Sequence, residues 1–146
     1  MRTGVFFLQT EDNRSLNIDS IAKYSANLPD VETVQILRLK PLPSVKFLTD
    51  QITTYNLERI VIAGDIPGYY KPVFTRAMAI AKGNTDEIRL ASFQEHGARG
   101  ENAMDRAKAI VACATMGIPF PLAAVPGGNP VNHATLIIGC QPSRIR

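Results

Sequence analysis

The chain has little cysteine, no tryptophan and no long hydrophobic run. Its two cysteines, Cys113 and Cys140, form no Cys-x-x-Cys pair, which fits a reducing compartment and offers no disulfide framework. No apolar segment approaches the roughly 20 residues that a membrane-spanning helix needs. The N-terminus also lacks the pattern of a secretory signal peptide. We therefore expect a cytoplasmic, globular protein with no membrane partner.

Sequence signatures of cofactor, nucleotide and nucleic-acid binding are also missing. Neither Gly-x-Gly-x-x-Gly nor Gly-x-x-x-x-Gly-Lys-Ser/Thr occurs, and these are the loops that hold dinucleotides and phosphates. The two histidines, His96 and His133, have no second ligand at metal-binding spacing. The net charge of +3 comes from dispersed Lys and Arg, whereas nucleic-acid binders cluster them. These absences predict no nucleic-acid partner.

The segment 59–81 combines a strand, a turn and a helix. Residues 60–63 form an uninterrupted apolar run, typical of a strand buried on both faces of a parallel sheet. Pro67 stiffens the following turn, Pro72 suits the first helical turn, and Gly83 is a suitable C-cap. The helix places its apolar residues on one face: Val73, Phe74, Ala77, Ile80 and Ala81. In open parallel sheets, the loop at a strand's carboxyl end usually holds the ligand.

The same alternation runs through most of the chain. Further strands are predicted in residues 4–8, 31–39 and 87–92, and further helices after Asn17, after Ser44 and over 101–116. Four of the six phenylalanines are predicted to lie in the core: Phe6, Phe7, Phe47 and Phe74. This order predicts an α/β fold: an open parallel sheet of four to five strands with helices on both faces, a three-layer Rossmann-like or flavodoxin-like architecture.

Composition divides the chain into three parts. Residues 1–118 are predicted to form a single α/β domain. Residues 119–133 are rich in proline and glycine, as linkers are. Residues 134–146 carry one more apolar strand, 134–139, which either joins the sheet or opens a second domain.

Few polar or aromatic side chains stand out as functional candidates. Asp65, at a strand's carboxyl end, either binds a cation or a substrate hydroxyl or serves a turn or salt bridge. His96, in a polar loop, is either a general acid or base or a solvated loop residue. Tyr69 and Tyr70 either form a contact surface or cover the sheet edge. The residues alone leave these alternatives open.

Taken in order, these elements resemble the amino-terminal domain of the A subunit of heterodisulfide reductase over nearly the whole chain. The family pattern is a hydrophobic strand, Ala-Ala-Cys-Ser-Pro, a short spacer and Pro-x-Phe-x-Arg-Ala. This chain has Ala63-Gly64-Asp65-Ile66-Pro67 and Pro72-Val73-Phe74-Thr75-Arg76-Ala77. Segments 4–7, 28–31 and 101–110 match in character. In the family a linker leads to the first strand of a flavin-binding domain, so residues 134–146 resemble the start of a truncated flavin-binding domain.

The resemblance implies an iron–sulfur site from which this chain departs. In the family, cysteines at the strand ends carry a four-iron cluster, because thiolates are soft, anionic and strong donors to iron. The positions that look equivalent here are Leu8, Thr10, Lys40, Asp65 and Gly97. None of these residues supplies a thiolate. We therefore expect no cluster bound in the family's way, no metal and no cofactor.

The vacated cluster position is the candidate ligand-binding site, and no catalytic residue is predicted. Its candidate residues are Thr10, Lys40, Asp65, Pro67 and His96. Lys40 and Asp65 end neighbouring predicted strands with opposite charges, which predicts an ion pair across the old cluster position with His96 nearby. The alternative is that a small ligand or anion binds there.

Three functions follow from these observations. The favoured one is a non-catalytic, cofactor-free module that docks onto other subunits of a heterodisulfide-reductase-like redox complex, or onto itself. Its candidate docking elements are Tyr69, Tyr70 and residues 119–130. The alternative is an electron-transfer or oxidoreductase component that binds a flavin or other small ligand at the strand carboxyl ends. A third possibility, a small enzyme using Asp65 and His96 as acid and base, requires both side chains in one pocket.

Overall fold

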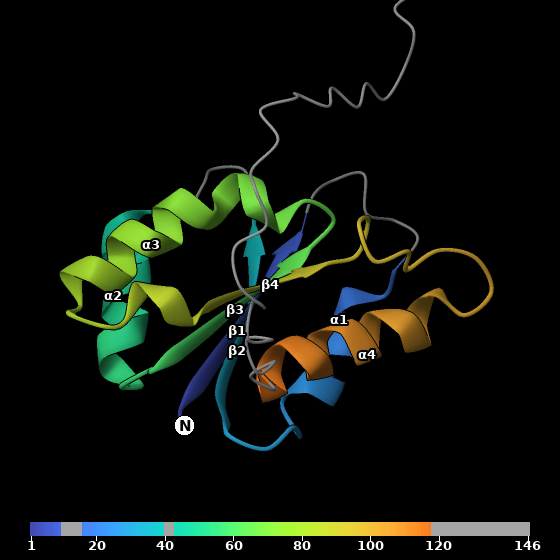
Figure 1. The fold of residues 1–146 in the computed structure, drawn as a ribbon, viewed down its shortest axis with the longest axis horizontal. Coiled ribbons are helices and arrows are strands. Elements are labelled where there is room, and N and C mark those ends of the chain that lie inside the picture. Colours follow the sequence, from blue (N-terminus) through green and yellow to red (C-terminus); the bar gives the residue numbers. More distant parts are fainter. Residues whose placement is uncertain (10–15, 40–42, 118–146) are drawn as a thin grey trace, which may run out of the picture.

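Strands and helices alternate along the part of the chain described by the computed structural model, which is residues 1–9, 16–39 and 43–117 (Figure 1). The elements are β1 (Thr3–Gln9), α1 (Ile18–Ser25), β2 (Val31–Arg38), α2 (Val45–Thr54), β3 (Arg59–Gly64), η1 (Pro67–Tyr70), α3 (Lys71–Ile80), η2 (Thr85–Glu87), β4 (Ile88–Ser92) and α4 (Ala103–Met116). The two elements labelled η are short 3-10 helices.

The strands form one parallel sheet in the order β2-β1-β3-β4. In this register Phe6 of β1 lies opposite Gln35 of β2 and Ile62 of β3. The predicted parallel α/β architecture is therefore confirmed, with four strands among the described residues. The possible fifth strand, 134–139, lies outside the described residues.

Helices cover both faces of the sheet, with α1 and α4 on one face and α2 and α3 on the other (Figure 1). Val5 and Phe7 of β1 point into the core under α1 and α4. Phe6 and Leu8 point into the core under α2 and α3. Successive side chains of a strand project to opposite faces, so a strand buried on both faces must be apolar at every position. This explains the uninterrupted apolar runs in the sequence.

The helix N-termini form at the predicted capping residues. The Asn17 side chain accepts a hydrogen bond from Ser20 N at 3.0 Å, and Ser44 Oγ accepts one from Phe47 N at 3.1 Å. Each bond satisfies an N–H group that has no partner within its own helix.

The C-terminus of α3 differs from the prediction. The left-handed residue is Lys82, with φ +59°, and not Gly83. Lys82 N donates to Ala79 O at 3.1 Å and Gly83 N to Met78 O at 2.9 Å, which is the Schellman arrangement. A Cβ on Gly83 would lie 2.5 Å from Met78 Sδ. A side chain at residue 83 would therefore force the buried Met78 side chain to move, whereas the backbone angle at this position does not require glycine.

Two predicted core residues are wrong. Phe47 is 38% exposed and Ile80 is 56% exposed. The buried face of α3 consists of Phe74, Ala77 and Met78, because residues three and four apart share one side of a helix. Ile80 lies outside that stripe, and Met78, which the apolar pattern did not single out, takes its place in the core.

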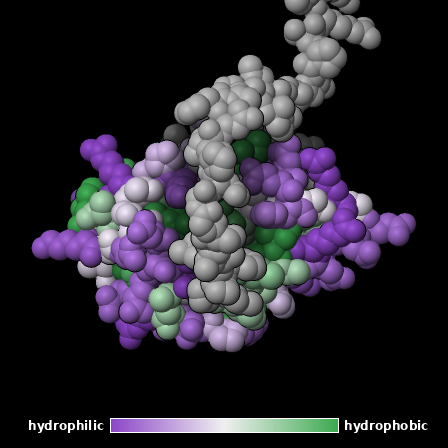
Figure 2. Space-filling view, viewed as in Figure 1, coloured by the Kyte–Doolittle hydropathy of each residue, from purple (hydrophilic) through white to green (hydrophobic). Residues whose placement is uncertain are grey.

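Hydrophilic residues dominate the described surface on the face seen in Figure 2, and hydrophobic residues form small groups between them. No helix within the described residues is both long enough and apolar enough to cross a membrane. The large apolar side chains that stand out in solvent include Tyr69 and Ile66, which lie between β3 and α3.

Candidate functional site

Two loops meet at the carboxyl edge of the sheet, where β3 ends at Gly64 and β4 ends at Ser92. Phe93 N donates to Gly64 O at 2.8 Å. The Asp65 carbonyl accepts two bonds, from Ser92 Oγ at 3.0 Å and from Gln94 N at 3.4 Å. Because these bonds join the first residues of both loops, the loops are held side by side.

The loop after β4 folds back on its own strand. His96 N donates to Ser92 O at 3.2 Å, and Ala98 N donates to Phe93 O at 2.9 Å. Glu95 N donates to Ser92 Oγ at 3.3 Å. The Ser92 hydroxyl thus bonds its own loop and the Asp65 loop at once. Phe93 and Ala98 are buried in the hydrophobic core, and their packing holds the turn against the sheet.

The Asp65 carboxyl is the electrostatically unusual group of this edge. Burial raises the pKa of Asp65 above its ordinary value, while the positive charge of Arg99 acts in the opposite direction. Arg99 is exposed, and its backbone N–H donates to Gly97 O at 2.8 Å. The turn around Gly97 thus places Arg99 where its positive charge acts on the Asp65 carboxyl.

Asp65→Asn is expected to stabilise the fold at pH 7 and to have no effect in acid. The folded pKa lies above the unfolded value of about 3.8, so the folded state binds more protons within that window. Stability of the native chain therefore falls as pH rises through the window. Above the window, the whole of the destabilisation caused by the ionised Asp65 carboxyl is present. Because the carboxyl is partly solvated, the gain should stay below about 1 kcal/mol.

Urea unfolding of both proteins at pH 7 and at pH 3 measures this difference in the free energy of unfolding. A difference that is the same at both pH values would contradict the assignment of the effect to this carboxyl.

The structure places three of the five predicted site residues. Asp65 is half-buried, Pro67 is buried at the start of η1, and His96 is exposed. Asp65 and His96 lie on adjoining loops, but no hydrogen bond or ion pair joins their side chains. Thr10 and Lys40 lie outside the described residues, so the Lys40–Asp65 ion pair stays a prediction. The use of Asp65 and His96 as acid and base also stays a prediction.

The sequence interpretation missed Ser92 and Arg99. Ser92 is the last residue of β4 and is buried, and a hydroxyl that ends a buried strand beside Asp65 was the available signal. Arg99 stands between two glycines with positive φ, Gly97 at +68° and Gly100 at +78°. That spacing indicates a tight turn, but no sequence pattern gives the direction of its side chain.

The described residues do not fit the four-iron cluster that the resemblance implies. Leu8 is buried and apolar, and Gly97 has a backbone angle that side chains rarely adopt. Cys113 is exposed in the last turns of α4. Within the described ranges, no three His, Cys, Asp or Glu residues come together. The donors that this edge offers are carboxylate, hydroxyl and carbonyl oxygens, which suit hard cations better than iron–sulfur clusters.

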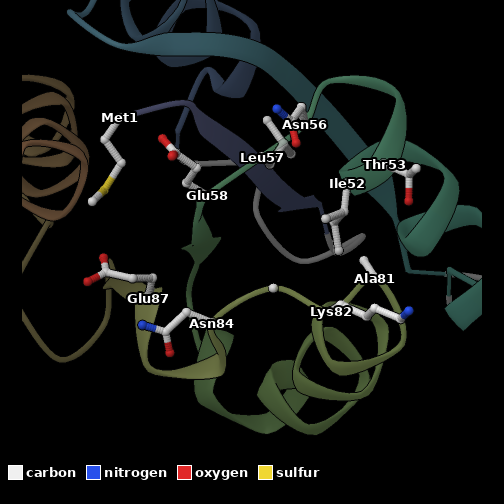
Figure 3. Close-up of a pocket in the computed structure, with 11 residues that line it drawn as sticks. Met1, Ile52, Thr53, Asn56, Leu57, Glu58, Ala81, Lys82, Asn84 and Glu87 are labelled. Carbon is white, nitrogen blue, oxygen red and sulfur yellow. The ribbon is translucent and has the colours of Figure 1, made fainter.

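A hollow of about 450 Å³ lies at the opposite, amino edge of the sheet, away from the predicted site (Figure 3). Glu58 and Glu87 lie on one side of it and Lys82 on the other. Both carboxylates are engaged: Glu58 Oε2 accepts from Arg2 N, and Glu87 Oε2 accepts from Arg59 Nε, each at 2.8 Å. The hollow is therefore a junction of strand starts and helix ends with its carboxylates already satisfied.

Comparison with known proteins gives a distant similarity. No family model matches the chain. The chain is 26% identical over 121 residues to a protein of Archaeoglobus profundus that is named for its likeness to the A subunit of heterodisulfide reductase. The alignment covers 77% of this chain but only 17% of that protein. The chain thus spans a small part of the relative's length, and over most of its own length it is distantly similar to a protein like the heterodisulfide reductase A subunit.

Proposed function

We propose that the chain is a non-catalytic, cofactor-free α/β module that docks onto other subunits of a redox complex. The observation that carries this proposal is the exposed apolar surface at the carboxyl edge, formed by Ile66 and Tyr69. The neighbouring Ser92 hydroxyl and Asp65 carbonyl are occupied in joining the two loops. The similarity to a protein named after a component of a reductase supplies the redox context.

The Tyr69 side chain projects into solvent from a turn whose neighbouring residues, Pro67 and Tyr70, pack against the protein. Its exposed fraction is 78%, and that of Ile66 is 58%. Tyr70 packs against the core below and meets the Tyr69 ring edge to face, with ring centroids 5.3 Å apart. Pro67 is buried at the start of the same turn. Tyrosine on a rigid base is favoured in interfaces, because it contributes a large contact area at low entropic cost.

The proposed partner is a protein that carries a flavin or an iron–sulfur cluster. Affinity capture of the tagged chain from its native cells, with partners identified by mass spectrometry, tests this. Tyr69→Ala is expected to reduce recovery of such a partner by a factor of about ten or more, the loss typical of an interface hot spot. Folding should be unaffected, because the side chain stands in solvent.

Tyr24→Ala is the matched control, since Tyr24 is 39% exposed on α1, remote from the carboxyl edge. This variant should recover the partner as the native chain does. Capture of no cofactor-bearing protein, or capture that is equal with Tyr69→Ala, would contradict the proposal. A visible absorption spectrum of the anaerobically purified chain checks the cofactor-free part: an absorption band above about 320 nm, where the side chains themselves do not absorb and flavins do, would favour the flavin-binding alternative.

The domain boundary at residue 118 is part of the same proposal. Helix α4 lies on the same face of the sheet as α1, and α1 connects β1 to β2. A right-handed crossover on this face leads back toward β2 and away from the outer edge of β4. Helix α4 therefore covers β3 and β4 on this face and is the last element of the four-stranded unit among the described residues. The proline- and glycine-rich composition of residues 119–133 supports a linker there, with 134–146 as part of a separate unit.

A further inference from the structure

The outer edge of β2 is a second surface built for association, and we propose that it pairs with β2 of a second copy of this chain. Among the described residues both β2 and β4 are edge strands. β4 has five residues with Arg89 near its middle, and short length and inserted charge are features that block edge pairing. β2 has eight residues, and its segment 33–37 contains no charge, proline or glycine.

The backbone groups that face outward from β2 can be identified. Leu39 N donates to Gln9 O of the β1 segment at 3.3 Å, so residue 39 directs its backbone groups toward β1. Because this direction alternates along a strand, residues 33, 35 and 37 also face β1. The N–H and C=O groups of Val34, Ile36 and Arg38 therefore face outward.

An antiparallel pair of β2 strands, related by a two-fold axis at Gln35, satisfies these groups. Val34 then lies opposite Ile36 of the second copy, and both residues are of the outward-facing kind, so they exchange both hydrogen bonds. The pairing is isologous and closes on itself, which gives a dimer and not a fibre. The two four-stranded sheets become one continuous sheet.

Charge selects this register over its neighbours. With the axis at Gln35, Glu32 of each copy lies opposite Arg38 of the other, so two opposite-charge pairs flank the apolar centre. An axis at Val34 would place Arg38 opposite Asp30, which precedes β2 and has φ +64°. An axis at Ile36 would place Glu32 opposite residue 40, beyond the end of β2. The axis at Gln35 is thus the one that keeps both members of each charge pair within the strand. Both side chains are exposed, and Glu32 Oε1 is 3.9 Å from Arg2 Nε, a long contact. They are thus positioned to pair across the axis.

The chain's own segment 134–139 is the competing occupant of this edge. Its sequence, Ala-Thr-Leu-Ile-Ile-Gly, carries no charge to pair with Glu32 or Arg38. A second copy supplies both charges in register, which favours self-association. Self-association through β2 is an interaction separate from the proposed docking onto a cofactor-bearing protein, and it does not depend on the Tyr69 surface.

Sedimentation equilibrium of the full chain tests the proposal. The expected result is a dimer of the 16.0 kDa chain at micromolar concentration. Glu32→Arg and Arg38→Glu each place like charges together twice and should weaken dimerisation about tenfold. The double variant E32R/R38E exchanges the charges and should restore it. A monomeric native chain, or a double variant as weak as the single variants, would overturn the proposal.

Cross-linking tests the register separately. In a non-hydrogen-bonded antiparallel pair, opposite Cα atoms are about 4.5 Å apart, within disulfide range. Gln35→Cys, made with Cys113→Ser and Cys140→Ser, should therefore give a covalent dimer on oxidation. Asp86→Cys in the same background, exposed on η2, should not. Occupancy of the edge by segment 134–139 would leave Gln35→Cys uncrosslinked and refute the dimer. Capture through Tyr69 would be unaffected by that result, so the two proposals fail independently.

Discussion

Arg59→Met is expected to destabilise the fold by about 2–4 kcal/mol, because Arg59 is a buried cation with two fixed partners. Its Nε donates to Glu87 Oε2 at 2.8 Å, and its Nη1 donates to the Thr115 carbonyl at 2.9 Å. Thr115 lies in the last turn of α4, where carbonyls have no partner within the helix. The substitution therefore leaves a carboxylate and a helix end unsatisfied together.

The surroundings of Arg59 show how closely the chain is fitted to it. A Cβ on Gly117 would lie 2.5 Å from Nη1, so a side chain at residue 117 would displace the guanidinium from its present position. Gly117 also has φ +49°, which glycine adopts without steric cost. The arginine at the start of β3 is thus packed directly against the C-terminus of α4.

Urea unfolding followed by circular dichroism measures the change, and two variants calibrate it. Arg59→Lys keeps the charge but lacks the forked donors that reach both partners. Its loss of unfolding free energy should therefore be measurable but smaller than that of Arg59→Met. Arg89→Met is the matched control: Arg89 Nη2 is 3.8 Å from the same Glu87 carboxylate and its side chain is 43% exposed. That loss should be below about 1 kcal/mol. Equal losses for Arg59→Met and Arg89→Met would contradict a special role for the buried contact.

The sheet could be predicted because its central strands, β1 and β3, are buried on both faces. Runs such as 60–63 have no polar residue, and such a run followed by a turn and a helix has few other interpretations. Once the strand order is known from the structure, the face that each helix covers follows from right-handed crossovers. The order itself was not predicted from the sequence. The failures at Phe47 and Ile80 arise where a helix face is broad, since periodicity gives a stripe of residues but not its edges.

The candidate site was harder to predict because backbone atoms build much of it. The Asp65 carbonyl and the loop N–H groups form the hydrogen bonds that hold the two loops together. Backbone groups are the same in every residue type, so the sequence does not reveal them. Asp65 was found from its position at a strand's carboxyl end, a general rule for parallel sheets. The placement of Arg99 near Asp65 depends on a turn with two positive-φ glycines and on how the two loops are joined. Such information is absent from a pattern of residue types.

The residues that carry the resemblance to the reductase family are packing residues. In the segment Pro72-Val73-Phe74-Thr75-Arg76-Ala77, Phe74 and Ala77 are fully buried under the sheet, and Pro72 opens the helix. The position that would carry the family's cysteine is a half-buried aspartate, Asp65. The resemblance therefore rests on residues that pack the fold, and not on the loop residue at the position of the family's cysteine.

Phe74→Ala should therefore cause the largest loss of stability, about 3–5 kcal/mol. Phe74 has no exposed surface, and it meets Phe6 of β1 edge to face with ring centroids 5.4 Å apart. Its removal leaves a cavity between α3 and the centre of the sheet. Because η1 leads directly into α3, the same cavity loosens the base beneath Tyr69.

Two substitutions separate core packing from docking in this experiment. Phe74→Leu keeps most of the volume and should cost less than about 2 kcal/mol, while Phe47→Ala removes a ring that is 38% exposed and should cost less than Phe74→Ala. Unfolding free energies from urea titration give the order. At a temperature where each variant is still folded, Phe74→Leu should capture partners as the native chain does. A Phe74→Ala protein as stable as Phe47→Ala would show that α3 does not pack on the sheet as described, and the Tyr69 surface would lose its support.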